Sequence, residues 1–153
     1  MAATTIYDAL RESHEKQRGL CTRLVRSADP QRRAETFRSL RTELAAHAAA
    51  EERYLYVPIL MYDMGLNSAR HALAEHHEMD ELVEDLGKLD PKGEAWAAKA
   101  KELSHKVRHH LKEEETKFFQ VSGKLLTATQ KTQLVRQYRA DYQRLLNEGA
   151  PSS

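Results

Sequence analysis

The sequence predicts an all-α fold, namely an antiparallel up-down four-helix bundle with an additional C-terminal helix. Apolar residues recur at alternating spacings of three and four, the pattern of helices that bury one face. Glycine and proline are scarce, with six and four among 153 residues, and they fall where helices are expected to begin or end. No segment alternates with the period of a strand. We expect one domain over residues 1–153, with the bundle at about 5–122 and the last helix at about 127–147.

Capping signals delimit the first two helices. The first is expected over about 5–26. Asp29 and Pro30 then supply an N-cap and a proline in the first helical turn, where its missing N–H costs nothing. The second helix is expected to close at Gly65. Within it, Pro58 should bend the helix or end its regular part, because the ring removes a hydrogen-bond donor.

The other three helices have comparable signals at their ends. The third is expected to close at Gly87, and the fourth to run to about Val121, before Gly123. Polar and proline-containing pairs mark the three starts: Asn67-Ser68, Asp90-Pro91, and Thr127 with Gln130, the last of which has the spacing of a capping box.

Composition narrows the classes of partner. Lys plus Arg is 24 and Asp plus Glu is 23, and a net charge of +1 argues against nucleic acid or anionic lipid as the main partner. No run approaches the roughly 20 apolar residues of a membrane span. The first ten residues lack a secretory signal, and Cys21 has no second cysteine to pair with, so we expect a cytoplasmic location. The fifth helix should pack on the bundle, which predicts a monomer or a weak homodimer.

Eight histidines are many for this length, and helical phase separates them into two groups. His110 has Val107 and Leu103 three and seven residues before it, whereas the same offsets from His109 give Lys106 and Glu102. The same comparison favours His76 over His77. The seam of the bundle therefore holds four histidines, with a glutamate one turn after two of them: His14, His47, Glu51, His76, His110 and Glu114.

Spacing alone would not select these residues. The pairs His71/Glu75, His77/Glu81 and His109/Glu113 also have His-x-x-x-Glu spacing, but their phase points away from the seam. We interpret His71, His77, His105 and His109 as surface residues.

A repeat in the sequence supports the chosen set. His14 and His76 are 62 positions apart, while His47 to His110 and Glu51 to Glu114 are both 63. The chain therefore consists of two similar helix pairs, each with two histidines and one carboxylate on the seam. Buried polar groups of this kind are costly unless they are paired or coordinated, and imidazole with carboxylate is a ligand set that suits iron or manganese.

These residues resemble the hemerythrin-like, HHE cation-binding family. The resemblance covers residues 6–121 and is carried by His47 to Glu51 followed by Leu55-Tyr56, and by His110 to Glu114 followed by Phe118-Phe119. It implies a non-haem di-iron centre with an oxo or hydroxo bridge. One iron would be bound by His14 and His47 and the other by His76 and His110, with the two glutamates bridging. Glu52 and Glu115 fall off the seam and are expected outside the ligand set.

The sequence departs from this family at one ligand position. Oxygen-carrying hemerythrins have a further histidine one turn before the third-helix ligand, where this chain has Ala72. Tyr54 lies three residues after Glu51, on the same face of a regular helix. We therefore predict Tyr54 as a phenolate ligand of the second iron, with a hydrogen-bonded tyrosine near the site as the alternative. Its counterpart in the repeat, Lys117, is expected to extend outward or to donate a hydrogen bond.

The expected activity follows from that site. A phenolate would favour ferric iron, which suits reaction with small oxidants better than reversible oxygen carriage. We predict decomposition of hydrogen peroxide (catalase-like), or nitric oxide scavenging, in stress defence. The alternatives are oxygen or iron binding without turnover, as a carrier or sensor, and a protein-interaction module that the metal only stabilises.

Overall fold

The computed structural model describes residues 4–149, and these residues are helical with no strand among them. The all-α prediction is therefore confirmed. In chain order the elements are α1 (Ile6–Arg26), α2 (Pro30–Glu51), the π-helix η1 (Glu52–Tyr56), α3 (Val57–Leu60), the 3₁₀-helix η2 (Asp63–Gly65), α4 (Leu66–Gly87), α5 (Glu94–Glu113), the π-helix η3 (Glu114–Phe118), α6 (Phe119–Leu125) and α7 (Ala128–Gly149).

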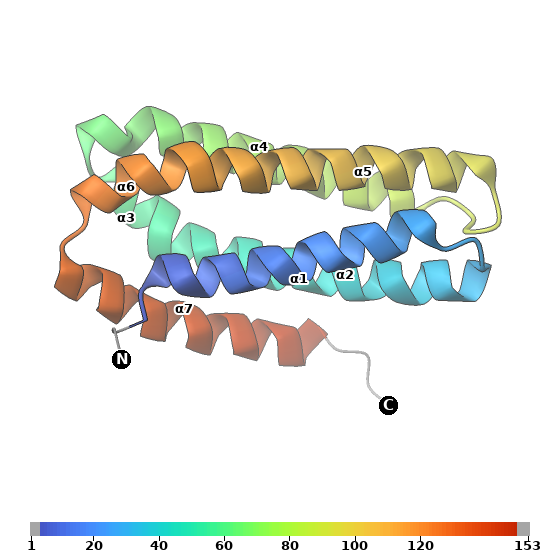
Figure 1. The fold of residues 1–153 in the computed structure, drawn as a ribbon, viewed down its shortest axis with the longest axis horizontal. Helices are drawn as coiled ribbons and strands as arrows, with labels where there is room; N and C mark the ends of the chain where they lie inside the picture. Colours follow the sequence, from blue (N-terminus) through green and yellow to red (C-terminus); the bar gives the residue numbers. More distant parts are fainter. Residues whose placement is uncertain (1–3, 150–153) are drawn as a thin grey trace.

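The long helices run side by side along the longest axis of the molecule (Figure 1). α1 packs against α2 and α5, and α4 packs against α5, so the residues between these helices are enclosed. α7 lies along the outer face of α1 and α2 and packs on both. The predicted last helix therefore covers one side of the helix pair that begins the chain.

Several predicted helix ends are found in the structure. Thr5 and Asp8 form a capping box at the start of α1, and the Asp29 side chain accepts a hydrogen bond from the backbone of Arg32 ahead of Pro30. Before α7, the backbone N–H of Thr127 donates to the Gln130 side chain at 2.8 Å, and the reciprocal bond is 3.1 Å. These caps satisfy donors that the first helical turn leaves free.

Four predicted boundaries differ from the structure. The second helix ends at Leu60 and not at Gly65, which is the last residue of the 3₁₀-helix η2. α4 begins at Leu66, before Asn67, with Gly65 at its N-cap and no side-chain cap. Pro91 lies in a turn, and α5 begins only after Gly93. Gly123 lies inside α6 and does not end it. Asp90 still has a local role, because its carboxylate accepts a hydrogen bond from the backbone N–H of Lys92 and so stabilises the turn.

Two π-helical turns interrupt the long helices at equivalent places. η1 begins directly after Glu51, and η3 begins at Glu114. In each turn the backbone donates five residues back, from Val57 to Glu52 and from Phe119 to Glu114. A π-turn contains one more residue than an α-turn, so the side chains after it point in a different direction around the helix axis than in a regular α-helix. Such turns are frequent at functional sites.

The apolar core is divided into two clusters. One lies near the connections at the η1 and η3 ends and contains Ile6, Leu10, Leu55 and Phe118 among others. The other surrounds Trp96 and includes Leu24 and Leu103. Trp96 is 2% exposed, so it is part of the core. Along the long helices, the buried polar residues described below lie between these two clusters. Within residues 4–149 no helix is long and apolar enough to cross a membrane.

Candidate metal centre

The seam residues chosen by helical phase converge at the middle of the fold. They come from α1, α2, α4, α5 and the first residue of η3, and none of their side chains is more than 4% exposed. The six residues brought together are His14, His47, Glu51, His76, His110 and Glu114. The other four histidines of the chain are exposed, as expected.

The six side chains form two overlapping clusters of possible metal ligands. One consists of His14 and His47 with both glutamates, and the other of His76 and His110 with the same two glutamates. In each cluster one ligand atom per residue lies within 4.8 Å of the others. The clusters are adjacent, because Glu51 and Glu114 belong to both.

Each carboxylate contacts one histidine of each cluster. Glu51 Oε1 lies 3.3 Å from His47 Nε2 and 3.2 Å from His76 Nε2. Glu114 Oε1 lies 3.1 Å from His14 Nε2, and its Oε2 lies 3.6 Å from His110 Nε2. Both glutamates therefore connect the two clusters, each of which also contains two imidazoles.

The inward-facing atoms lack ordinary hydrogen-bond partners. Such atoms are rare in buried sites, because an unsatisfied buried polar group costs about 1–3 kcal/mol. Here they lie together, and all are nitrogen or oxygen atoms that can bind a metal cation: His14 Nε2, His47 Nε2, His110 Nε2, both carboxylate oxygens of Glu51, and Glu114 Oε1. The chemistry of these residues therefore fits a bound metal cation.

The Nδ1 atoms of His14 and His47 have hydrogen-bond partners from η3 and α7. His14 Nδ1 lies 2.7 Å from Glu115 Oε2, and Arg18 in turn donates to Glu115 Oε1 at 2.7 Å. His47 Nδ1 lies 3.0 Å from the hydroxyl of Tyr138, which belongs to α7. A partner on Nδ1 selects the tautomer and orients the ring, so that Nε2 faces the centre.

His110 and His76 each have a carboxylate near the same ring nitrogen, Nδ1. His110 Nδ1 lies 3.0 Å from Glu75 Oε1. His76 Nδ1 lies 3.7 Å from Glu52 Oε2, too far for a direct hydrogen bond. Glu52 and Glu115 thus lie outside the six-residue set, as the sequence analysis expected, and next to its histidines.

The tyrosine beside the centre is Tyr56, and not Tyr54 as predicted. Tyr56 is fully buried, its hydroxyl donates a hydrogen bond to Glu114 Oε2, and it lies 3.3 Å from His76 Nε2. Tyr54 is only half-buried, and its ring lies under the guanidinium of Arg53. The cause is η1. In a regular helix the residue three after Glu51 shares its face, but a π-turn brings the residue five after it to that face.

The two halves of the centre differ at this position. The counterpart of Tyr56, 63 residues later, is Phe119, whose ring stacks on His14 with centroids 5.8 Å apart. A phenol therefore lies beside the His76/His110 half and a phenyl ring beside the His14/His47 half. Lys117, the expected counterpart of Tyr54, is exposed and lines a pocket together with His110 and Glu114.

The carboxylates of the centre raise the pKa values of two of its histidines. Burial disfavours the charged form of His14, but hydrogen bonds with Glu114 and Glu115 outweigh it and raise the pKa of His14 to about 9. The same balance, with Glu51 as the main partner, raises the pKa of His76 to about 10. The carboxylates therefore attract positive charge strongly to this location, and a proton and a metal cation compete for the same nitrogens.

The pKa values of the acidic groups follow the same logic. Burial would raise the pKa of Glu51, but His47 and His76 overcome this and hold that pKa well below its usual range. Burial, reinforced by the nearby charges of Glu114 and Glu51, raises the pKa of the Tyr56 phenol well above its ordinary value. A phenol next to two carboxylates keeps its proton unless a cation offsets their charge.

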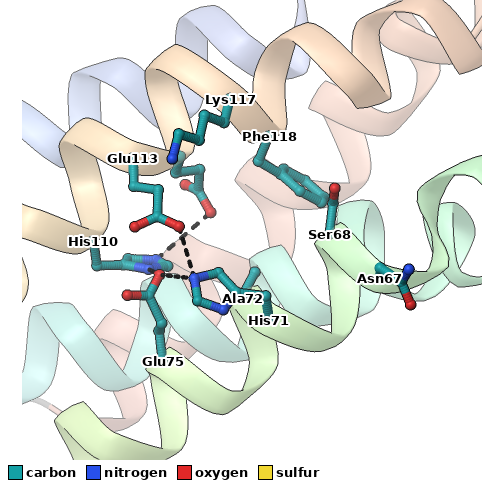
Figure 2. Close-up of a pocket in the computed structure, with 10 residues that line it drawn as sticks. Asn67, Ser68, His71, Ala72, Glu75, His110, Glu113, Lys117 and Phe118 are labelled. Atoms are coloured by element: carbon teal, nitrogen blue, oxygen red, sulfur yellow. Dashed lines mark hydrogen bonds and ion pairs between the residues drawn. The ribbon is translucent and has the colours of Figure 1, made fainter.

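A pocket of about 230 Å³ reaches the His76/His110 half from solvent. His110 and Glu114 form its inner end, and Ala72 and Lys117 also line it. Figure 2 shows His110 and Glu75 at one end of the pocket and Asn67 at the other. Ala72, one turn before His76, contributes only a small side chain to the wall of this pocket.

Comparison with known proteins defines the class of this protein. The hemerythrin HHE cation-binding domain matches residues 5–121, which is most of the chain. The chain therefore belongs to the hemerythrin HHE cation-binding family, and the resemblance seen in the sequence is confirmed.

One relative is a protein named DNA nickase from Nostoc sp. (strain PCC 7120 / SAG 25.82 / UTEX 2576), which is 30% identical over 135 residues. The alignment covers 88% of this chain and 38% of that protein, so the chain spans well under half the length of the relative. No solved structure gives a significant match.

Sequence reasoning missed the groups that orient the histidines. Tyr138 was visible only as a residue of an amphipathic helix, and Glu75 only as half of a pair expected to point away from the seam. No local spacing connects them to His47 or His110. One signal was available for Tyr56, since Leu55-Tyr56 and Phe118-Phe119 occupy equivalent positions in the repeat.

Proposed function

We propose that this protein holds two iron ions in one buried centre and reacts there with small oxidants, by decomposing hydrogen peroxide or by scavenging nitric oxide. In this proposal the scaffold is an antiparallel four-helix bundle of the hemerythrin kind, with α7 packed on its outer face. The observation that carries the proposal is the pair of buried clusters sharing Glu51 and Glu114. Cations bound by His14 with His47, and by His76 with His110, would be neighbours joined by both carboxylates, with an oxo or hydroxo bridge as the family implies.

Iron fits the donor set best when Tyr56 is included. Imidazole and carboxylate suit iron and manganese alike, whereas a phenolate donor favours a ferric ion. When bound, the iron pair would supply electron transfer and an open coordination position for a small ligand. The protein residues then hold the ions, orient the imidazoles through their Nδ1 partners and keep bulk water from the His14/His47 half.

The pocket supports a small ligand. Its volume of about 230 Å³ exceeds that of a few water molecules, each of which takes about 30 Å³ in the liquid. It ends at His110 and Glu114, beside the half of the centre that also has Tyr56. Peroxide, oxygen and nitric oxide pass through such an opening readily.

Two alternatives have specific features in their favour. Reversible oxygen or iron binding without turnover fits the family and would be favoured if Tyr56 remains a neutral phenol that only donates to Glu114. A module that binds another protein, with metal as a structural element, would be favoured by bound metal without any reaction with exogenous ligands.

A reaction with nucleic acid is less well supported than a reaction with small oxidants. The name of the Nostoc relative suggests DNA cleavage, but this chain spans 38% of that protein and has a net charge of only +1. Electrostatic attraction to phosphates needs a basic surface. Incubation of the iron-loaded protein with supercoiled plasmid tests this directly, and nicking above a zinc-loaded control would revive it.

The leading proposal is tested by the visible spectrum and by peroxide turnover. Protein purified from iron-supplemented cells should show a broad visible charge-transfer band that is lost in Tyr56→Phe and kept in the matched variant Tyr54→Phe. Oxygen release from hydrogen peroxide, followed with an oxygen electrode, should exceed that of zinc-loaded protein, and nitric oxide consumption is measured alongside. A wild-type protein with two irons, no such band and no peroxide turnover would contradict the proposal and favour oxygen carriage.

A further inference from the structure

Two histidine–glutamate pairs that lie off the seam come together at the surface. His71 and Glu75 belong to α4, and His109 and Glu113 belong to α5. His71 Nε2 lies 2.7 Å from Glu113 Oε1 and 3.5 Å from Glu75 Oε1. His109 Nε2 lies 2.9 Å from the other oxygen of Glu113 and 4.0 Å from Glu75 Oε2. Two imidazoles and two carboxylates from neighbouring helices therefore face one another.

This outer cluster, defined as His71, Glu75, Glu113 and His109, lies on the route to the buried centre. His71, Glu75 and Glu113 line the same pocket that ends at His110 (Figure 2). The imidazole of His71 is 58% exposed and the carboxylate of Glu75 only 5%, so the cluster extends from solvent to the interior. Glu75 Oε1 also lies 3.0 Å from His110 Nδ1, so the outer cluster is in direct contact with the centre.

We propose that His71, Glu75 and Glu113, flanked by His109, form an outer site for a divalent cation, through which iron(II) reaches the buried centre. The entry role rests on the proposed function, whereas the outer site itself does not. Ligand atoms of His71, Glu75 and Glu113 already lie within 4.8 Å of one another. Neutral imidazole and carboxylate are suitable ligands for a divalent first-row metal ion.

The surroundings make this a site for weak and exchangeable binding. Lys106 Nζ lies 3.4 Å from Glu75 Oε2, so it competes with a cation for that oxygen. The same ammonium group lies 2.5 Å from Glu78 Oε2 and can keep that partner when a cation binds. Partial exposure and a competing lysine both lower affinity relative to the enclosed centre, which suits a site that passes its ion on.

An isolated pair on the same helix provides the matched control. His77 Nε2 and Glu81 Oε1 have the same one-turn spacing and lie 2.8 Å apart, but the two side chains are 74% and 65% exposed. No group of metal ligands among the described residues includes them. A histidine–glutamate pair is therefore common to both places, and only the outer cluster adds carboxylate and imidazole groups from α5.

Binding is tested by equilibrium dialysis of the iron-loaded protein against cobalt(II). The wild type should bind one further cation per chain, and His71→Ala and Glu113→Gln should each weaken that binding by about tenfold or more. His77→Ala should bind as the wild type does. Unchanged cobalt affinity in both outer-cluster variants, or equal loss in the His77 variant, would overturn the site.

The entry role is tested by the rate of iron(II) uptake after chelator treatment. His71→Ala should take up iron several-fold more slowly than the wild type and reach the same final iron content, while His77→Ala should match the wild-type rate. Equal rates in all three proteins would overturn the entry role. If no iron enters the centre, yet the wild type binds one cobalt that His71→Ala does not, the proposed function fails and the outer site stands.

Discussion

Replacement of Tyr138 by phenylalanine removes one hydroxyl from α7 and leaves the six proposed ligands in place. That hydroxyl lies 3.0 Å from His47 Nδ1 and 2.9 Å from Ser13 Oγ, and the tyrosine is 1% exposed. The variant ring is of nearly the same size, so the packing of α7 on α1 and α2 is retained. The imidazole of His47 then has no partner that selects its tautomer.

The expected loss can be scaled from the structure. Removing the group that orients a metal-ligating histidine typically lowers metal affinity about 10–100-fold, or about 1.4–2.7 kcal/mol. Ser13 can turn to the hydroxyl of Tyr142, so mainly one buried group is left unsatisfied. We therefore expect the free energy of unfolding of the metal-free protein to fall by about 1–2 kcal/mol.

The assay is competition with a chelator for iron(II), or for cobalt(II) as a spectroscopic substitute, together with urea unfolding. Tyr142→Phe is the control, because this tyrosine stacks on Tyr138 but its hydroxyl donates to Glu43, at 2.5 Å. It should change metal affinity less than about threefold. Equal affinities in the two variants would refute the reasoning that α7 contributes to the centre through His47.

The remaining predictions concern backbone packing and pH. Gly65→Ala should lower the free energy of unfolding by about 1–3 kcal/mol in urea titrations, because a Cβ there would lie 2.9 Å from the carbonyl oxygen of Ile59. Gly19→Ala, where no atom lies within 4 Å, should raise it by about 0.5–1 kcal/mol, and equal effects would contradict this packing. Chelator-treated protein should lose stability as pH rises from about 6.5 through 9 to 10, since the folded-state pKa values of His14 and His76 are raised and each stabilises only while protonated. Metal-loaded protein should lack this loss, and a flat pH profile after chelation would be the contrary result.

Helical phase was sufficient to identify the residues that meet in the core. Each of the six proposed ligands lies on an apolar stripe, and a regular helix keeps that phase over several turns. The repeat of 62 or 63 residues added independent support, since it brought equivalent histidines to equivalent helices. These features are local or periodic, and for that reason the sequence was informative about them.

Helical phase gave the wrong tyrosine after Glu51, because the helix is not a regular α-helix there. The π-turn η1 adds a residue to the turn, and that change brings Tyr56 to the centre and leaves Tyr54 beside Arg53. No property of the residues in η1 signals this turn by itself. The equivalent turn η3 suggests that the geometry of the centre favours both.

Contacts between distant helices were the other feature beyond reach of the sequence. Tyr138 is 91 residues from His47, and Glu75 is 35 residues from His110. Their positions depend on how α7 and α4 pack, which amphipathic patterns alone do not specify. The same packing brings together the two histidine–glutamate pairs of the outer cluster, each of which looks like an ordinary surface pair in the sequence.

The central claim is that two irons share Glu51 and Glu114, and iron content measured with the magnetic coupling of the two ions tests it most directly. Protein from iron-supplemented cells should contain two irons per chain, and Mössbauer spectra in an applied field should show a coupled diferric pair with a diamagnetic ground state. Glu114→Gln should bind less iron, because it removes one of the two carboxylates that the irons share. One iron per chain, two uncoupled irons, or no bound iron in the wild type would contradict the account.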